Sequence, residues 1–193
     1  MKKYLILIII LITTATSIKA QEKMRVGGGL VYTTGYHYDK VNSDANKSPF
    51  LGIFITGIYE MKLSIQLAPS LTYFIPHVYT LESGPSTSIK STVSAMMFDL
   101  NAHYVFNSLD RFEFYGLAGA DILVTSRKET FNGKEHDNAL GLNLGAGSYI
   151  KATKQMLGFV EAKYVFSKYG QFMVNAGVLV NLTYIIKHSK EPV

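Results

Sequence analysis

The sequence predicts an all-β fold, an eight-stranded antiparallel up-and-down transmembrane β-barrel. Three observations support this prediction: about eight segments alternate with period two, their connections alternate between short and long, and the chain begins with an export signal. Each segment is near or above the roughly 9 to 11 residues with which a tilted strand crosses the hydrocarbon layer.

The segment over residues 139–151 shows the alternation in an unusual form. One face carries Leu140, Leu142, Leu144, Ala146 and Ile150, and the other carries Gly141, Asn143, Gly145 and Gly147. A soluble sheet normally places bulky polar residues opposite its apolar face. A small second face suits the crowded inside of a narrow barrel, with the apolar face toward lipid. We expect Tyr149, Glu161 and Lys163 to fill the space that the glycines leave.

The predicted strands follow one another with short breaks. They span residues 25–34, 50–59, 62–75, 90–106, 112–124, 138–151, 156–166 and 172–187. In the second, the inward and outward faces stay open, because Phe54 and Ile58 share a face with Gly52 and Thr56. In the third, Pro69 lacks a backbone donor, so we expect a bulge there.

The connections differ in length in a regular order. Those at 60–61, 107–111, 152–155 and 167–171 are short, whereas those at 36–49, 76–89 and 125–137 are long and polar. Outer-membrane barrels have short periplasmic turns and longer external loops. We therefore expect three external loops, with both chain ends on the periplasmic side.

The first 20 residues predict a secretory signal peptide, and residues 21–193 predict one barrel domain. Lys2 and Lys3 precede an apolar run that is too short for a membrane helix, and Ala20 precedes the expected cut, whose exact position Lys19 leaves open. Three leader lysines account for three of the five net positive charges, and the remaining basic residues are scattered. This distribution argues against nucleic acid as a partner. The chain has no Cys, which excludes a cysteine lipid anchor and disulfides.

Aromatic residues gather at the ends of the predicted strands. Two belts of such residues are typical of the interfaces of a membrane barrel, although aromatics also end strands simply because they pack well in sheets. We expect an aromatic girdle that includes Tyr59, Tyr104, Phe106, Phe112, Phe166, Phe172 and Tyr184.

The leader, the eight alternating segments, the glycine-rich inner faces and the final segment VNAGVLVNLTYIIK together resemble the small outer-membrane β-barrel families. The chain is most similar to the PorT-like outer membrane beta-barrel domain group, with OmpA-type and OmpX-type barrels as more distant relatives. The resemblance covers the mature chain and implies a role in envelope assembly or secretion. One departure is that many such families end on an aromatic residue, whereas here a polar tail follows Tyr184, Ile185 and Ile186.

Several polar residues fall on the predicted inward faces. They are Asp99, Asn101, His103, Glu113, Asp121, Glu161 and Lys163, with Arg25 near the base. Ionisable groups at membrane depth are costly unless they pair or meet water, so we expect a bonded network in the lumen, with Lys163 paired to Asp99 or Asp121. An eight-stranded barrel is only wide enough for its own side chains, which favours a plug over a conduit.

The loop histidines give an alternative reading. His37 with Asp39, His77, and the run Glu135, His136 and Asp137 lie in the long loops. Converging loops with such residues would suit a metal or acid–base site. No fixed spacing supports one, so no catalytic residue, cofactor or metal is predicted.

The sequence thus favours a non-enzymatic outer-membrane barrel that meets outer-membrane lipid and presents its loops to external or periplasmic protein partners. The alternatives are a narrow porin or small-solute channel, a loop-based enzyme, and a periplasmic lipocalin-like barrel with an apolar ligand inside.

Overall fold

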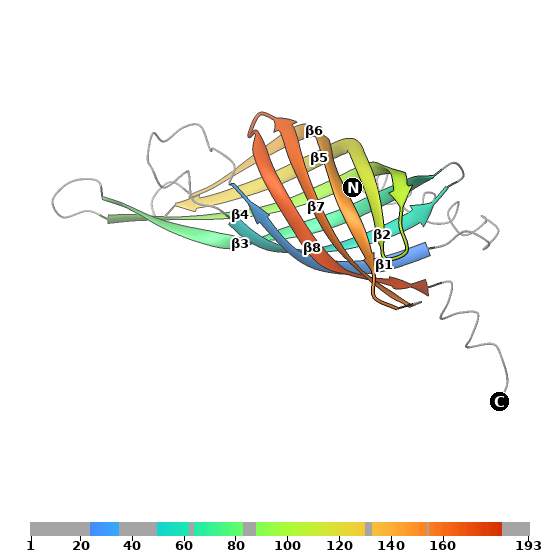
Figure 1. Ribbon diagram of the computed structural model, residues 1–193. Helices are drawn as coiled ribbons and strands as arrows, with labels where there is room; N and C mark the ends of the chain where they lie inside the picture. Colours follow the sequence, from blue (N-terminus) through green and yellow to red (C-terminus); the bar gives the residue numbers. More distant parts are fainter. Residues whose placement is uncertain are drawn as a thin grey trace, which may run out of the picture.

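The computed structural model describes residues 24–34, 50–61, 64–82, 88–129, 133–153 and 155–182. These residues form a closed barrel in which every strand pairs antiparallel with its neighbours in the chain and β8 closes against β1 (Figure 1). The strands are β1 (Met24–Thr33), β2 (Phe50–Glu60), β3 (Ile65–Glu82), β4 (Ser88–Ser108), β5 (Phe112–Glu129), β6 (Gly133–Lys151), β7 (Met156–Ser167) and β8 (Gln171–Asn181). The predicted fold class is confirmed. Within the described part of the chain, no helix is long and apolar enough to span a membrane.

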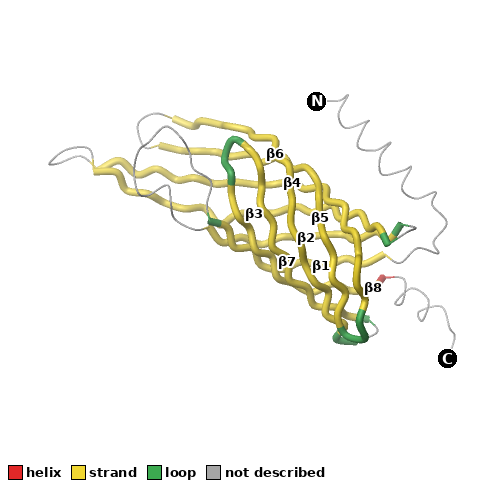
Figure 2. Tube along the Cα trace, turned by 45° about the horizontal axis from the view of Figure 1, so that its top comes forward, coloured by secondary structure: helices red, strands yellow, loops and turns green. Residues whose placement is uncertain are grey.

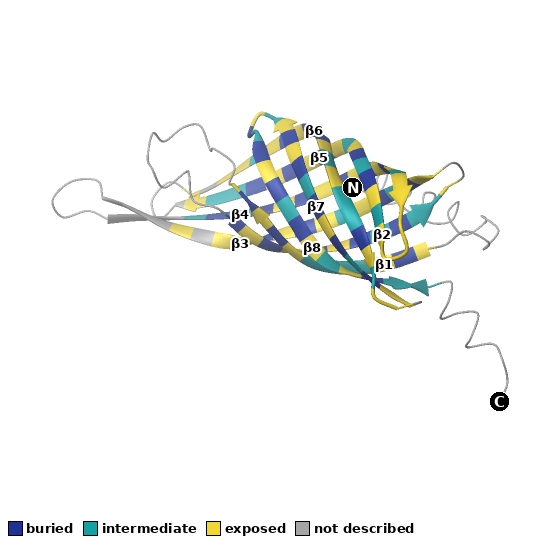
Figure 3. Ribbon diagram, in the orientation of Figure 1, coloured by how far each residue is buried: buried dark blue, intermediate teal, exposed yellow. Residues whose placement is uncertain are grey.

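Side chains alternate along each strand between the lumen and the outer surface, which gives the checkerboard of Figure 3. In β6, Leu140 is 75% exposed and Leu142 is 65% exposed, whereas Asn143 and Tyr149, which have the opposite parity, are buried. The packed core of the described residues therefore lies inside the barrel, and the large apolar residues of β6 lie outside it. In β2, the face left open by the sequence is inward, since Phe50, Gly52, Phe54, Thr56 and Ile58 are all buried.

Four strands continue past the point where the other four end. Pairing of β2 with β3 stops at Gly52 and Phe74, and pairing of β6 with β7 stops at Gly141 and Ser167. Beyond these points β3, β4, β5 and β6 still pair with one another, as far as Glu82 with Ser88 and Glu129 with Gly133. We call this part, residues 75–82, 88–94, 125–129 and 133–140, the protruding sheet; Figure 2 shows it leaving the barrel wall on one side.

The protruding sheet corrects two predicted loops. Residues 76–89 and 125–137 were expected to be irregular, but most of them are strand. Polar side chains mark the end of the apolar belt, but the strands continue to pair beyond it. An antiparallel hairpin satisfies its backbone hydrogen bonds in water as well as in lipid. Gly133, at the start of β6, adopts a φ of +80°, which glycine does at little cost. The predicted loop over residues 36–49 lies outside the described residues.

The bulge expected at Pro69 is also wrong. Pro69 pairs in register with Leu100 of β4, and the register between β2 and β3 is the same on both sides of it. The carbonyl of Pro69 accepts a hydrogen bond from Thr56 Oγ1 at 3.1 Å. The register shifts instead between Phe74 and His77, where Pro76 lies, and again between Val105 and Asn107 in β4. A proline needs a bulge only where its missing donor would otherwise be paired.

The short connections follow the prediction, and the strand ends differ by a few residues. Strands β7 and β8 are joined by residues 168–170, and β6 and β7 by residues 152–155. β8 ends at Asn181, so residues 183–187 of the predicted last strand, together with Tyr184 and the predicted signal peptide, lie outside the described residues.

Candidate functional site: the polar interior of the barrel

The polar residues predicted to face inward lie inside the barrel at three levels. Asp99, Asn101, His103, Asp121, Glu161, Lys163 and Arg25 are each at most 5% exposed. Glu113 lies at the barrel mouth formed by the chain ends and short turns, where its side chain is 15% exposed. The first level lies near the middle of the barrel, and the third lies at that mouth.

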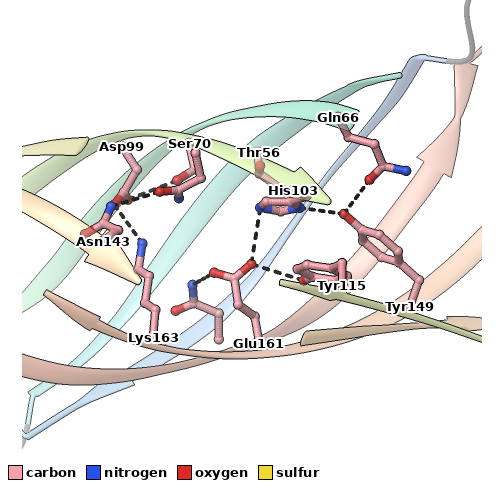
Figure 4. A network of polar contacts seen from close by, with 12 residues as sticks. Thr56, Gln66, Ser70, Asp99, His103, Tyr115, Asn143, Tyr149, Glu161 and Lys163 are labelled. Carbon is pink, nitrogen blue, oxygen red and sulfur yellow. Dashed lines mark hydrogen bonds and ion pairs between the residues drawn. The ribbon is translucent and has the colours of Figure 1, made fainter. Parts of the chain in front are cut away.

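At the first level, Asp99 of β4 accepts hydrogen bonds from three strands (Figure 4). Its Oδ1 accepts from Lys163 Nζ at 2.7 Å and from Asn143 Nδ2 at 2.9 Å, and its Oδ2 accepts from Ser70 Oγ at 3.0 Å. Lys163 and Asp99 are both 1% exposed, so the two charges meet with little solvent. Of the two carboxylates proposed for Lys163, the structure pairs it with Asp99.

At the second level, aromatic rings stack across the lumen. His103 and Tyr115 stack with centroids 4.4 Å apart, and Tyr115 and Tyr149 with centroids 4.5 Å apart. Tyr149 Oη lies 2.8 Å from His103 Nδ1 and donates to Gln66 Oε1 at 3.0 Å. Tyr115 Oη donates to Glu161 Oε2 at 3.1 Å, and Asn175 Nδ2 donates to Glu161 Oε1 (Figure 4).

At the third level, ion pairs close the mouth beside the chain ends. Arg25 of β1 binds Glu60 at the end of β2, and its Nη1 lies 3.8 Å from Glu113 Oε2. Lys151 Nζ lies 3.0 Å from the other oxygen of Glu113. The Arg25 guanidinium also lies 5.4 Å from the centroid of the Tyr149 ring, which joins this level to the aromatic stack.

Some buried polar atoms have no hydrogen-bond partner among the described residues. They include both carboxylate oxygens of Asp121, which is 2% exposed and pairs in register with Asp99. His103 Nε2 lacks a hydrogen bond and lies 3.6 Å from Glu161 Oε2. A void of about 20 Å³ adjoins His103, Glu161 and Asn175. A single water needs about 10 to 15 Å³, so this void has room for about one water and not for a stream of ions.

The half of the lumen on the side of the long hairpins is apolar, which the sequence analysis did not anticipate. Phe74, Met97, Leu123, Val165 and Met173 point inward there and are at most 1% exposed. Two polar residues beside them bind each other, since Thr33 Oγ1 donates to Gln171 Oε1 at 2.8 Å. This apolar layer lies between the polar interior and the hairpin side. Period two alone could not reveal it, because both faces of these strand halves are apolar.

The glycines of β6 make room for side chains from neighbouring strands. A Cβ at Gly147 would lie 2.5 Å from the Tyr115 ring, and a Cβ at Gly145 would collide with the backbone oxygen of Ala162 and lie 2.8 Å from Lys163 Cβ. A Cβ at Gly141 would collide with the Asp121 carboxylate. The residues that use this space are therefore Tyr115, Lys163 and Asp121, together with Tyr149 on β6 itself, whereas Glu161 faces Tyr115 and Asn175.

The outer surface carries the predicted girdle residues at both ends. Near the short turns, Tyr104, Phe106 and Phe112 are 58%, 61% and 41% exposed. On the hairpin side Phe166 and Phe172 are exposed, and the Tyr164 and Phe166 rings pack edge to face at 4.7 Å. Tyr59 also points outward but is only half-buried.

The candidate loop site is not assembled among the described residues. No group of three or more His, Asp or Glu is placed there to hold a metal ion, and His37 and Asp39 lie outside the described residues. Asp137 instead accepts hydrogen bonds from Lys168 Nζ at 2.7 Å and from Tyr169 Oη. These bonds, that from Lys168 first, hold the pKa of the Asp137 carboxyl below its usual range and raise the pKa of Lys168. They tie the β7–β8 turn to β6 outside the apolar belt.

Sequence reasoning missed several members of the interior network. Gln66, Ser70, Tyr115, Asn143 and Asn175 were not named as site residues, although each has inward parity in its strand. Parity could have found them. The partner of each could not be found this way, because it depends on which strands lie opposite across the lumen.

Comparisons with known proteins support the fold. No family model matches the sequence, and no curated protein matches it. Several solved structures are similar, among them these three. Ail of Yersinia pestis, in complex with the heparin analogue sucrose octasulfate, is 17% identical over 82% of this chain and 98% of that one, with a TM-score of 0.55. The N-terminal β-barrel domain of Pseudomonas aeruginosa OprF is 16% identical over 84% and 100%, with a TM-score of 0.52. A major outer membrane protein of Thermus thermophilus is 12% identical over 84% and 100%, with a TM-score of 0.58. The chain therefore has the fold of the eight-stranded outer-membrane β-barrels.

Proposed function

We propose that this protein is a non-enzymatic outer-membrane barrel that anchors the protruding sheet as an interaction surface. The observation that carries the proposal is the difference in strand length. Strands β3 to β6 have 18 to 21 residues, whereas β1, β2, β7 and β8 have 10 to 12. The shorter lengths already suffice to cross a membrane, so the additional residues serve a purpose beyond spanning.

The protruding sheet offers what a protein partner needs. Beyond Phe74, β3 has no paired strand on its β2 side among the described residues, and before Gly141, β6 has none on its β7 side, where the Asp137 side chain contacts the β7–β8 turn. Unpaired backbone groups along such edges can accept an additional strand. Exposed side chains on β3 include Val78, which is 58% exposed. A strand from another protein is the partner that this geometry fits.

The barrel itself suits an anchor better than a channel. From the middle of the barrel toward the mouth beside the chain ends, the lumen holds the Asp99–Lys163 pair, the aromatic stack and the Arg25 cluster, and an apolar layer fills it on the hairpin side. Conduction would require these groups to move. We expect no steady single-channel conductance in planar bilayers, and a steady current that changes when Asp99 or Lys163 is neutralised would favour the channel.

A narrower role follows from the resemblance to the PorT-like group. We propose that the partner belongs to the machinery of envelope assembly or secretion. The support is the predicted leader and the barrel architecture. A deletion strain would test this role through the amount of exported protein that reaches the cell surface.

Membrane insertion is tested by a charge on the outer face. Lys in place of Leu142, at membrane depth, should cost about 2 to 4 kcal/mol of folding free energy in lipid vesicles. Lysine in place of Asn138 provides the matched control, because Asn138 lies four residues before Leu142 on the same outward face of β6. We expect the boiled and unboiled wild-type protein to migrate differently in gels. A chain that stays soluble without detergent, and that tolerates Leu142→Lys as well as Asn138→Lys, would support the lipocalin-like alternative.

The interaction surface is tested by crosslinking in cells. A photo-crosslinking residue at Val78 should give a discrete protein adduct, and one at Leu144 on the apolar belt should give none. Replacement of residues 77–92 by Asn-Gly shortens the β3–β4 hairpin to the barrel rim. The shortened protein should fold as a barrel but should fail to restore the wild-type phenotype to a deletion strain. Full function of the shortened protein would contradict the proposal.

A further inference from the structure

The outer wall of the barrel has a hollow of about 430 Å³ over β4, β5 and β6. Ala120, an outward position of β5 with a small side chain, lines the hollow together with the inward positions Asp121 and Gly141. Its rim consists of large apolar residues, among them Phe98, Ile122, Leu140 and Phe166. Leu140 and Phe166 are 75% and 56% exposed, so the hollow opens outward and away from the lumen.

The position of the hollow along the membrane normal follows from its place on β5. Outward positions of β5 stay apolar from Phe112 to Val124, which is about 40 Å along the strand and about 30 Å in height at a tilt of roughly 40°. That height matches the hydrocarbon layer. Ala120 and Ile122 lie in the half nearer the hairpins, so the hollow lies at the depth of acyl chains in one leaflet.

Charges are sorted by face just beyond the apolar belt. The outward positions, which continue the faces of Val124 and Leu140, carry Ser126 and Lys128 on β5 and His136 and Asn138 on β6. The acids Glu135 and Asp137 occupy the opposite face, which continues the buried Ala139. The basic side chains Lys128 and His136 thus lie on the outward face of this hairpin, and the acidic side chains Glu135 and Asp137 lie on the other face.

Lys128 lies where a lipid headgroup would be. It is exposed and has no ion-pair partner within the described residues, and its register partner on β4 is the uncharged Thr92. Lys128 is four residues beyond Val124, where the apolar belt ends, which is about 14 Å along the tilted strand and about 10 Å in height, so its long side chain can reach back to the headgroups.

We propose that the hollow and the basic positions above it bind one membrane lipid with an anionic phosphate headgroup, its acyl chain in the hollow and its phosphate at Lys128 and His136. The proposal rests on the membrane location argued above. Apolar filling and a charge at headgroup height identify a lipid, because a soluble anion would leave the hollow open and a neutral amphiphile would leave Lys128 without a counterion.

The test measures retained lipid on the folded barrel. The mature chain in neutral detergent is mixed with equal amounts of phosphatidylglycerol and phosphatidylcholine with identical acyl chains, and bound lipid is counted by native mass spectrometry. We expect about fivefold more phosphatidylglycerol than phosphatidylcholine on the wild type. Lys128→Ser should bring this ratio close to one. Arg111→Ser, a control at the opposite mouth, should leave it unchanged.

A second arm tests the hollow. Ala120→Phe should lower the retention of both lipids, whereas Ala118→Phe, on the same outer face of β5 but outside the hollow, should not. Should Ala120→Phe fail to fold, Ala120→Leu fills the hollow with less bulk, and the Lys128→Ser arm stands independently. Equal retention of the two lipids by the wild type, an unchanged ratio in Lys128→Ser, or equal effects of the two phenylalanines would each overturn the lipid site. Failure of the wild type to fold in micelles would instead contradict the membrane location.

Discussion

Loss of the buried ammonium of Lys163 should destabilise the barrel more than loss of the partly exposed ammonium of Lys151. In Lys163→Met, an unbranched side chain one heavy atom shorter replaces lysine, and Asp99 loses the donor that lies 2.7 Å from its Oδ1. The remaining donors, Asn143 and Ser70, are neutral. Asp99 and its neighbour Asp121, whose oxygens have no hydrogen-bond partner among the described residues, then share the lumen without the nearest cation.

The magnitude follows from the burial of the pair. Removing one partner of a fully buried ion pair costs about 3 to 5 kcal/mol, because an uncompensated charge remains in a poorly solvated site. Lys151 provides the comparison, since its side chain is 36% exposed at the mouth and it pairs with Glu113 at 3.0 Å. An ion pair of that kind contributes at most about 1 kcal/mol. Lys163→Met should therefore exceed Lys151→Met by about 2 kcal/mol or more.

The assay is reversible urea unfolding in lipid vesicles, followed by far-ultraviolet circular dichroism because the chain has no Trp. A double variant, Lys163→Met with Asp99→Asn, removes both charges. The amide at position 99 can still accept from Asn143, and its NH2 group can donate to the Ser70 hydroxyl. Replacing both partners of a buried pair is often nearly neutral, so the double variant should recover much of the loss.

Two results would refute the reasoning. A cost below about 1 kcal/mol for Lys163→Met would mean that water reaches Asp99, as in an open conduit. A double variant that is less stable than Lys163→Met would mean that Asp99 is stabilised by groups other than Lys163.

Three further predictions concern single positions. Asp121→Asn should raise the free energy of unfolding by about 1 to 3 kcal/mol, because its carboxylate is buried without hydrogen bonds to the described residues, whereas Asp110→Asn on the surface should have no measurable effect. Gly147→Ala should cost about 1 to 3 kcal/mol in the same assay through overlap with Tyr115, and Gly116→Ala, whose added Cβ meets nothing within 4 Å, should not; equal stability of the two would show that the ring moves freely. The lowered pKa of Asp137 means that its stabilisation is complete above the unfolded value of about 3.9 and is lost as the pH falls through the folded value. The stability difference between the wild type and Asp137→Asn should accordingly shrink between about pH 4 and pH 2, and a constant difference would show that Asp137 titrates normally.

Period two was sufficient for the barrel because the side-chain direction in a strand is a local property. It predicted that Leu140, Leu142 and Leu144 share the outer face and that Asn143 shares the inner one, and the structure shows this arrangement. It also placed most strand boundaries within a few residues. It failed at residues 76–89 and 125–137, where the polar composition that ends the apolar belt was taken to end the strands.

The contacts inside the lumen depended on the tertiary structure. The sequence determined that Asp99, Lys163 and Glu161 point inward, because that requires only their parity. It left open whether Lys163 meets Asp99 or Asp121, since both occupy paired positions on β4 and β5, and only the closure of β8 onto β1 fixes how far β7 lies from each. The apolar layer, the protruding sheet and the outer hollow likewise exist only once the strands are staggered around the barrel. Stagger sets which residues share a level, and no single strand carries that information.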